Sequence, residues 1–232
     1  MGTIRGIAVV FAFVALSGVA PAHAAEAYFV AHDKVNLLEL LAPPPGPRDP
    51  RTRVELDELR QIQQSRMPAR VAVAQADVEE TVFRLTLVLQ KPLTADQVPK
   101  TAALFHQLAV DTGGDTGPAK QGFGRPRPYT VARDLHPVCP LGNNKSYPSG
   151  HATVGYYMGV ILAAMVPEQR ASIFARTQAF AESRLICGVH YRSDIEAGRI
   201  AGTVLAALAM NDGSFKAAFA AAKAELRTAL GM

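Results

Sequence analysis

Apolar residues recur every three or four positions along much of the chain, and this periodicity predicts α-helices. Residues 54–67 and 69–90 follow the pattern and are rich in Ala, Leu, Glu and Gln, which favour helix formation. Within the second stretch, residues 83–89 (FRLTLVL) also fit a short strand. Further helices are predicted over residues 94–113 and, as an amphipathic segment, over residues 213–230.

The second half of the chain contains three more predicted helices, over residues 150–166, 168–186 and 194–211. The last carries almost no charge after Arg199, which predicts a central position in the fold. Residues 111–142 are instead rich in Gly, Pro and polar residues, and the pair Gly113-Gly114 is predicted to stop the preceding helix. We predict a long loop here, of the kind that compact domains usually keep for function.

No internal repeat, domain-scale linker or series of alternating strands is visible in the sequence. Five prolines between Pro43 and Pro50 predict an extended arm rather than a helix. The predicted fold class is therefore all-α, with residues 25–232 forming a single compact helical domain. A segment of this length can bury one sizeable core.

Residues 1–24 have the pattern of a secretory signal peptide. Arg5 precedes an uncharged apolar stretch over residues 7–19, and Pro21-Ala22-His23-Ala24 provides the small residues of a cleavage site. The apolar stretch is shorter than the roughly 20 residues that a spanning helix needs, although without cleavage it could still anchor the chain. We therefore expect cleavage after Ala24, a periplasmic or secreted protein, and no stable membrane association afterwards.

The charge balance argues against one class of partner. The chain has 24 Lys and Arg against 20 Asp and Glu, a net charge of +4, and loss of Arg5 with the leader lowers it to +3. This excess is mild, and no dense basic run or aromatic ladder accompanies it, so we expect no nucleic-acid partner. A local anion site remains compatible with it.

Two cysteines, Cys139 and Cys187, are present. In an exported chain an even number of cysteines favours a disulfide, and only one pairing is possible here. Two separate buried thiols are the alternative.

Three polar clusters could together bind an anion. The predicted loop carries the cations Lys120, Arg125 and Arg127, although such a basic loop is usually just solvated. Ser149-Gly150-His151 stands at a predicted helix start, where N–H groups and the helix dipole favour an anion. Gly150 has no Cβ, so a ligand oxygen can approach the backbone. Taken alone, this second cluster could equally be an ordinary helix cap followed by a chance histidine.

The third cluster is SRLICGVHYRSD, which contains Ser183, Arg184, His190 and Asp194. His190 and Asp194 are four residues apart, so the carboxylate can reach one ring nitrogen and fix the tautomer. The other nitrogen is then available as a base, a nucleophile or a metal ligand.

A metal site is the competing interpretation, because His151, His190 and Asp194 could be three ligands. The neighbouring cations Lys120, Arg127 and Arg184 disfavour a divalent cation there and suit a phosphate, which arginine binds in bidentate fashion. We therefore expect an oxyanion site with two histidines, no metal and no cofactor.

The three clusters match a known signature, K-x6-R-P, then P-S-G-H, then S-R-x5-H-x3-D, with all fixed residues in order between Lys120 and Asp194. The chain thereby resembles the acid phosphatase and vanadium haloperoxidase superfamily, which also contains the type 2 phosphatidic acid phosphatases. The leader, the short length, LLAPPP, SYPSGH and SRLICGVHYRSD are similar to bacterial class A non-specific acid phosphatases. Lipid phosphatases of the superfamily are similar only in motif, and haloperoxidases are usually larger.

The resemblance implies an all-α, metal-independent hydrolase of small phosphomonoesters, commonly oligomeric, with a homodimer favoured and phosphotransfer to alcohols as a side reaction. It implies that His190 is the nucleophile that forms a phosphohistidine and that Asp194 orients it. His151 would protonate the leaving oxygen and then activate water. The residues expected to hold the phosphoryl oxygens are Lys120, Arg127, Ser149, Gly150 and Arg184. Phosphoryl transfer depends mostly on positioning and charge stabilisation, which this set supplies.

Two other functions are compatible with these residues. A vanadate-dependent haloperoxidase would use the same anion site, with His190 bound to vanadium. A non-catalytic oxyanion-binding protein would use the cations, but it would need neither the two histidines nor Asp194 behind one of them.

Overall fold

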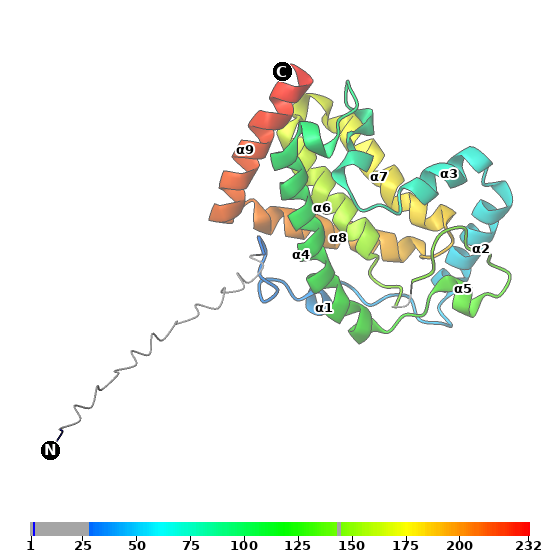
Figure 1. Cartoon of the computed structure of the whole chain (residues 1–232). Helices are drawn as coiled ribbons and strands as arrows, with labels where there is room; N and C mark the ends of the chain where they lie inside the picture. The colour runs from blue at the N-terminus through cyan, green and yellow to red at the C-terminus, as the bar shows by residue number, and fades with distance from the viewer. Residues whose placement is uncertain (1, 3–27, 143–144) are drawn as a thin grey trace.

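The computed structural model describes residue 2 and residues 28–142 and 145–232, and these form helices and connecting segments without a β-strand. The predicted all-α class is confirmed (Figure 1). The predicted signal peptide and its cleavage site lie outside the described residues, apart from Gly2. In the described part, no helix is both long and apolar enough to cross a membrane.

The helices differ widely in length. In chain order the described α-helices are α1 (Leu37–Leu40), α2 (Pro50–Ser65), α3 (Pro68–Ala76), α4 (Pro99–Phe123), α5 (Pro128–Val131), α6 (Gly150–Met165), α7 (Arg170–Ile186), α8 (Arg192–Ala209) and α9 (Gly213–Leu230). Short 3-10 helices are η1 (Val82–Arg84), η2 (Thr86–Val88), η3 (Ala95–Gln97) and η4 (Pro167–Gln169). The four helices predicted in the second half of the chain are thus confirmed, with ends that differ by at most two residues.

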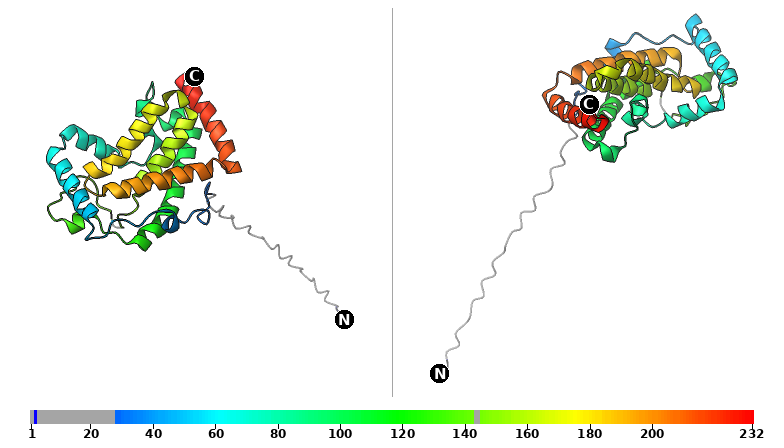
Figure 2. Two further views of the ribbon diagram at one scale, coloured as in Figure 1. Left: turned by 180° about the vertical axis from the view of Figure 1, so that it is seen from behind. Right: turned by 90° about the horizontal axis from the view of Figure 1, so that it is seen from above.

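Helix α6 occupies the centre of the molecule, with α7 and α8 packed against it and α4 on another side (Figures 1 and 2). The contact with α8 is very close, because a Cβ atom on Gly202 would lie 2.2 Å from the carbonyl oxygen of Thr153. The starts of the two helices are also joined, since the Ser149 N–H donates to the carbonyl oxygen of Asp194 at 3.0 Å. This packing brings the second and third predicted clusters together.

Helix α4 is longer than predicted, and this corrects the sequence-based loop. It continues through the glycine pair and Pro118 to Phe123, and its C-cap Gly124 has a φ of +63°, in the left-handed region. Packing explains the difference. The His32 ring lies directly on Gly114, where a Cβ atom would be 2.1 Å from its Cε1 atom. Gly114 therefore allows the close approach of His32 and does not stop the helix. Tertiary packing outweighs the low helix propensity of glycine here.

The segment after α3 is also less regular than predicted. The predicted helix over residues 69–90 ends at Ala76, and residues 83–89 form the 3-10 turns η1 and η2 instead of a helix or a strand. Asp77 holds this turn region, because its carboxylate accepts hydrogen bonds from Arg84, Arg176 and Ser183. The predicted extended arm is confirmed up to Asp49, which caps α2 by accepting the Arg51 N–H.

Candidate active site

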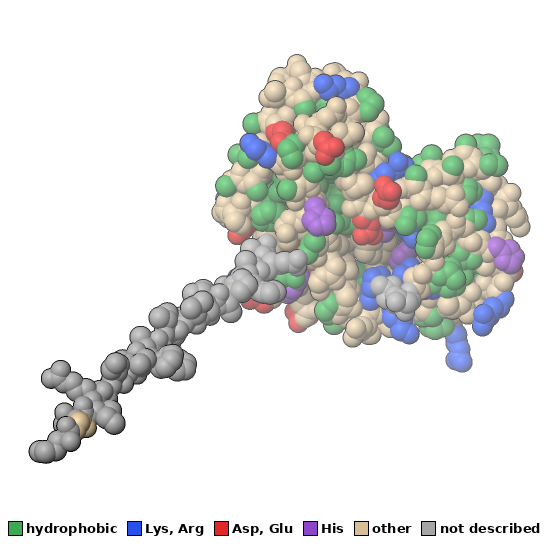
Figure 3. All heavy atoms as spheres, viewed as in Figure 1, with side chains coloured by type: hydrophobic (Ala, Val, Ile, Leu, Met, Phe, Trp, Pro, Cys, Tyr) green, Lys and Arg blue, Asp and Glu red, His purple; other side chains and the backbone are tan. Residues whose placement is uncertain are grey.

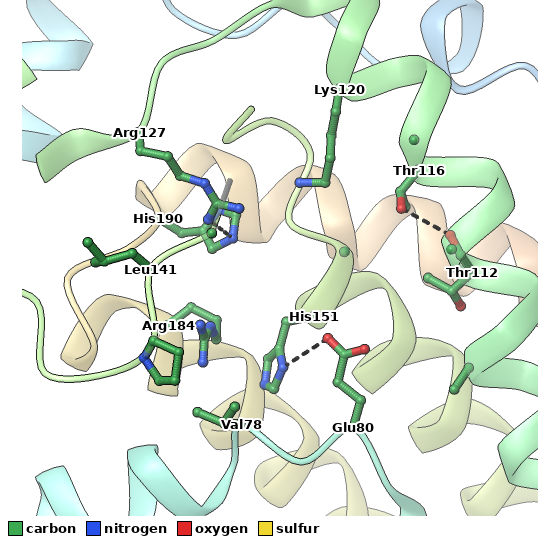
Figure 4. A pocket seen from close by; sticks show the side chains of 16 residues that line it. Val78, Glu80, Thr112, Thr116, Lys120, Arg127, Leu141, His151, Arg184 and His190 are labelled. Carbon is green, nitrogen blue, oxygen red and sulfur yellow. Dashed lines mark hydrogen bonds and ion pairs between the residues drawn. The ribbon is translucent and has the colours of Figure 1, made fainter. Parts of the chain in front are cut away.

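A cavity of about 360 Å³ lies where α4, α6 and the segments before α5 and α8 meet. In the space-filling view, basic, acidic and histidine side chains gather in a hollow between the part that carries α4 and α9 and the part that carries α2, α3 and α5 (Figure 3). The cavity is lined by most of the predicted site residues, namely Lys120, Arg127, Gly150, His151, Arg184 and His190 (Figure 4).

His190 is almost completely buried, and each of its ring nitrogens has a distinct environment. Nδ1 lies 3.0 Å from Asp194 Oδ2, and Nε2 lies 2.7 Å from Arg127 Nη1. Because a carboxylate only accepts and a guanidinium only donates, these contacts assign the proton to Nδ1 and the lone pair to Nε2. Burial lowers the pKa of His190 to about 3, even though Asp194 opposes this effect.

Asp194 stands behind His190 and is fully buried. Its Oδ2 accepts hydrogen bonds from the Tyr191 N–H at 2.9 Å and from the Ser146 hydroxyl. Burial alone would raise the pKa of Asp194, but contacts with His190 and with Arg125 lower it to about 2, so the group is a carboxylate. The predicted pairing of His190 with Asp194 is therefore present, and Asp194 itself does not line the cavity.

Arg125 is a residue whose place sequence reasoning missed. It was grouped with the cations of the loop, but its Nη1 donates to Asp194 Oδ1 at 2.7 Å. Its Nη2 donates to Glu55 Oε2 at 2.7 Å, and its guanidinium lies 3.7 Å above the ring of Tyr191. Arg125 thus supports Asp194 from behind, away from the cavity. The only signal in the sequence was charge: a buried Asp194 needs a cation to balance it, and the loop offers Lys120, Arg125 and Arg127 without indicating which one.

Three cations face the cavity. Lys120 extends from α4 and donates to the carbonyl oxygen of Pro148 at 2.6 Å. Arg127, just before α5, donates to the carbonyl oxygen of Val189 at 2.9 Å as well as to His190. Arg184 comes from the last turn of α7, and its Nε has no hydrogen-bond partner within the described residues. Such convergent, buried donors suit an anion with several oxygens.

Burial disfavours the charged forms of these side chains and therefore lowers their pKa values. Desolvation, and next the charge of Arg127, lower the pKa of Lys120 to about 7. Desolvation likewise lowers the pKa of Arg184 to about 10. An anion between them would favour their charged forms.

The start of α6 forms another wall of the cavity. Ser149 is its N-cap and accepts the Ala152 N–H at 3.2 Å, so the predicted capping role of Ser149 is confirmed. Ser149 is fully buried and, unlike Gly150, does not line the cavity. A Cβ atom on Gly150 would lie 3.5 Å from Thr116 and 3.9 Å from Lys120, so its absence leaves that space open to a ligand.

His151 follows in the first turn of α6 and stacks on Phe180, with ring centres 4.0 Å apart. Its Nδ1 lies 3.4 Å from Oε1 of Glu80, while its buried Nε2 has no hydrogen-bond partner in the described part of the chain. Burial and next the charge of Arg184 lower the pKa of His151, whereas Glu80 acts in the opposite direction.

Glu80 is the second residue that sequence reasoning missed. It lies between α3 and η1, outside the motif segment, and its side chain points at His151 across the cavity wall (Figure 4). Nothing in its sequence surroundings distinguishes it from Glu79 beside it, which does not line the cavity. Burial would raise the pKa of Glu80, but the contact with His151 and the charges of Arg184 and Lys120 lower it, so Glu80 is anionic.

The predicted disulfide between Cys139 and Cys187 is present, with 5.2 Å between the Cα atoms. It joins the segment after α5 to Cys187, the residue that directly follows α7 and lies three residues before His190. The backbone next to it is also paired, because the Val138 N–H donates to the carbonyl oxygen of Cys187 at 3.1 Å. The bond therefore connects two walls of the cavity.

His, Cys, Asp and Glu side chains do not form a metal-binding group of three or more anywhere in residues 28–142 and 145–232. The three candidate ligands of the metal interpretation are divided, since His151 pairs with Glu80 while His190 and Asp194 pair with each other. The arrangement instead combines an oriented neutral imidazole, three cations, a helix start and a second histidine. Chemically, it can bind a tetrahedral oxyanion and place a nucleophile and an acid around it.

Comparison with known proteins agrees with this chemistry. The chain matches the PAP2 superfamily over residues 101–216, half of its length. It is 33% identical over 202 residues to an acid phosphatase of Zymomonas mobilis, covering 82% of this chain and 75% of that protein. It is 30% identical over 205 residues to a non-specific acid phosphatase of Salmonella typhimurium, covering 84% of this chain and 81% of that protein.

Solved structures show a similar fold. A bacterial vanadium-dependent iodoperoxidase superposes with a TM-score of 0.59 at 18% identity over 74% of this chain, which spans about half (52%) of the iodoperoxidase. A transmembrane PAP2-type phosphatidylglycerolphosphate phosphatase of Bacillus subtilis superposes with a TM-score of 0.50 at 16% identity, covering 68% of this chain and 84% of that one. These two likenesses concern the fold alone, whereas the sequence matches show that the chain belongs to the PAP2 superfamily and, within it, to the acid phosphatases.

Proposed function

We propose that this acid phosphatase is exported and hydrolyses phosphomonoesters without a metal, through a phosphohistidine on His190. The observation that carries the proposal is the state of His190. Its Nδ1 is held by Asp194, its Nε2 carries the lone pair and contacts Arg127, which also lines the cavity, and its lowered pKa keeps the ring neutral in acid. A neutral, oriented imidazole beside three cations is suited to attack a phosphoryl group.

In the proposed first step, His190 Nε2 forms a bond to phosphorus as the bond between phosphorus and the leaving oxygen breaks. His151 donates a proton to that oxygen, which leaves as an alcohol. In the second step, water attacks phosphorus and gives a proton to His151, and the nitrogen–phosphorus bond breaks. Orthophosphate is released and His151 is again protonated. An alcohol in place of water would give the phosphotransferase side activity.

The cations are proposed to stabilise the charge on the phosphoryl oxygens during both steps. Lys120, Arg127 and Arg184 surround the cavity, and the backbone at Gly150 supplies N–H groups at the start of α6. The Ser149 hydroxyl accepts the Ala152 N–H and still has its own hydrogen to donate, so we keep it as a further ligand.

Export is supported by the leader pattern of residues 1–24 and by the disulfide, since disulfides persist in oxidising compartments. We propose a periplasmic or secreted location on this basis. We also propose that the mature protein is a homodimer and binds no nucleic acid. The dimer is inferred from the family resemblance, and sedimentation of the mature protein tests it.

The first test is a substrate panel of phosphomonoesters, diesters and pyrophosphate, assayed at acid pH with and without EDTA. We expect monoester hydrolysis that EDTA does not reduce and that vanadate inhibits by binding the same cavity. Loss of activity in EDTA with recovery in zinc or magnesium contradicts metal independence. Halide oxidation by peroxide that requires vanadate, without phosphatase activity, would favour the peroxidase. Phosphate binding without either activity would identify a binding protein.

The second test separates the two histidines. His190→Ala removes the nucleophile, so we expect activity on alkyl and aryl phosphates to be lost together and no phosphoenzyme to form. His151→Ala removes the acid, worth typically about 10²–10⁴-fold, and should harm an alkyl phosphate more than p-nitrophenyl phosphate, whose leaving group needs no proton.

The intermediate is trapped by rapid quenching into alkali, in which phosphohistidine survives. His151→Ala should accumulate phosphoenzyme from p-nitrophenyl phosphate, because water then lacks its base. Equal losses on both substrates without a trapped intermediate, or a phosphoenzyme in His190→Ala, contradict the assigned roles.

A further inference from the structure

Among the described residues that line the cavity, Glu80 is the acidic one, and Lys120, Arg127 and Arg184 are the basic ones. Its carboxylate lies 3.4 Å from His151 Nδ1, and about half of its side chain (47%) is exposed, whereas His151 is 6% exposed. The charged groups that act on this pair come from several elements, namely Arg184 from α7, Lys120 from α4 and Asp77 at the end of α3. A bound phosphoryl dianion would pair with the three cations. The negative charge of Glu80 would then face the rest of the substrate.

The position of His151 determines where the remainder of a substrate must lie. The leaving oxygen has to meet the acid, so the group attached to it projects along the side of the cavity that His151 and Glu80 border. The opposite wall on that side is the face of α4 with Thr112, Gly113 and Thr116, which is uncharged (Figure 4). Thr112 and Thr116 offer hydroxyl groups there, although each donates its hydrogen to a carbonyl oxygen within α4.

We propose that Glu80 is a specificity-determining residue that selects uncharged, hydroxyl-bearing leaving groups and discriminates against anionic ones. The inference rests on the proposed function, because it uses His151 as the acid. Once His151 has given its proton to the leaving oxygen, the Glu80 charge is no longer neutralised by the imidazolium. A carboxylate or second phosphate on the departing group is then repelled, while a polyol or sugar hydroxyl can donate to the carboxylate.

The size of the effect follows from Coulomb's law. Two unit negative charges about 7 Å apart change a rate by about threefold in water-like surroundings, and by more where solvent is partly excluded. Because Glu80 is half-exposed, we expect about three- to tenfold discrimination at low ionic strength. High salt should reduce it.

The test uses two substrates that differ in charge but not in leaving-group chemistry. Glycerol 3-phosphate and 3-phosphoglycerate both release a primary alcohol with a hydroxyl on the next carbon. The third carbon is a hydroxymethyl group in glycerol 3-phosphate and a carboxylate in 3-phosphoglycerate. The ratio of their kcat/KM values therefore cancels any change in the acid strength of His151. We expect Glu80→Gln to raise the 3-phosphoglycerate to glycerol 3-phosphate ratio about three- to tenfold, and Glu80→Lys to raise it further.

Glu79→Gln is the matched control, because it makes the same charge change one residue away, on an exposed side chain that does not line the cavity. It should leave the ratio at the wild-type value. A ratio unchanged in both Glu80 variants, or changed equally by Glu79→Gln, overturns the proposal. Wild-type protein that hydrolyses neither substrate nor any other monoester would instead contradict the proposed function, so the two failures are distinguishable.

Discussion

At the scale of residues, the two histidines of the cavity are both buried, and each has a carboxylate near its Nδ1, Asp194 for His190 and Glu80 for His151. Burial lowers the pKa of His190 to about 3, and Asp194 opposes this effect. Burial and the charge of Arg184 lower the pKa of His151, and Glu80 opposes that effect. The nucleophile is competent when neutral, so its activity is lost as the pH falls through about 3. The acid is competent when protonated, so its activity is lost as the pH rises through a pKa below the usual 6.5.

We therefore predict a bell-shaped pH profile of kcat/KM that lies on the acid side of neutrality. Glu80→Gln removes the main group that raises the pKa of His151, so the alkaline limb should move to lower pH while the acid limb stays in place. Profiles for glycerol 3-phosphate measured on both proteins test this, since ionisation of the substrate is common to both. An alkaline limb at the same pH in the variant would show that Glu80 does not act on the acid.

Lys120 gives a second prediction at this scale. Its lowered pKa of about 7 means that the cavity loses one positive charge as the pH rises through neutrality. Sulfate keeps its two charges over this range, so its inhibition constant reports the protein alone. We expect sulfate inhibition to weaken above about pH 7 in the wild type. Lys120→Arg, whose guanidinium remains protonated, should flatten this dependence, and an equally steep weakening in that variant argues against Lys120 as its cause.

At the scale of elements, the contact between α6 and α8 positions the site, because one helix begins at the capping Ser149 and the other just after His190. The contact depends on the missing side chain at Gly202, where a Cβ atom would meet the Thr153 carbonyl oxygen at 2.2 Å. Backbone atoms cannot move aside as a flexible side chain can, so a substitution there has to separate the helices.

We predict that Gly202→Ala destabilises the fold by about 1–3 kcal/mol, the usual cost of overpacking, and lowers Tm by several degrees. Activity should fall as well, because the starts of the two helices shift relative to each other. Gly213→Ala at the start of α9 is the control, since nothing lies within 4 Å of its Cβ position. Thermal unfolding of both variants gives the comparison, and equal Tm values would refute the packing argument.

At the scale of the whole molecule, the disulfide links chain segments 48 residues apart and connects the two walls of the cavity. For a loop of this length the chain-entropy model gives about 4 kcal/mol of stabilisation. We predict that the Cys139→Ala, Cys187→Ala double variant loses stability of this order in urea unfolding. A reducing agent should destabilise the wild type similarly and leave the double variant unchanged. Two thiols titrated in denatured, unreduced protein would contradict the bond itself.

The sequence alone determined the all-α class, the helices of the second half, the disulfide pair, and the two histidines and three cations that line the cavity. These features are local or follow from a motif, so periodicity, capping and spacing suffice to predict them. The extent of α4 was decided by tertiary structure, because the contact of His32 with Gly114 and the packing around it outweigh the usual effect of two glycines and a proline. The same holds for Arg125 behind Asp194 and for Glu80 beside His151. Their roles depend on which distant segments come together, since charge interactions act through space rather than along the chain.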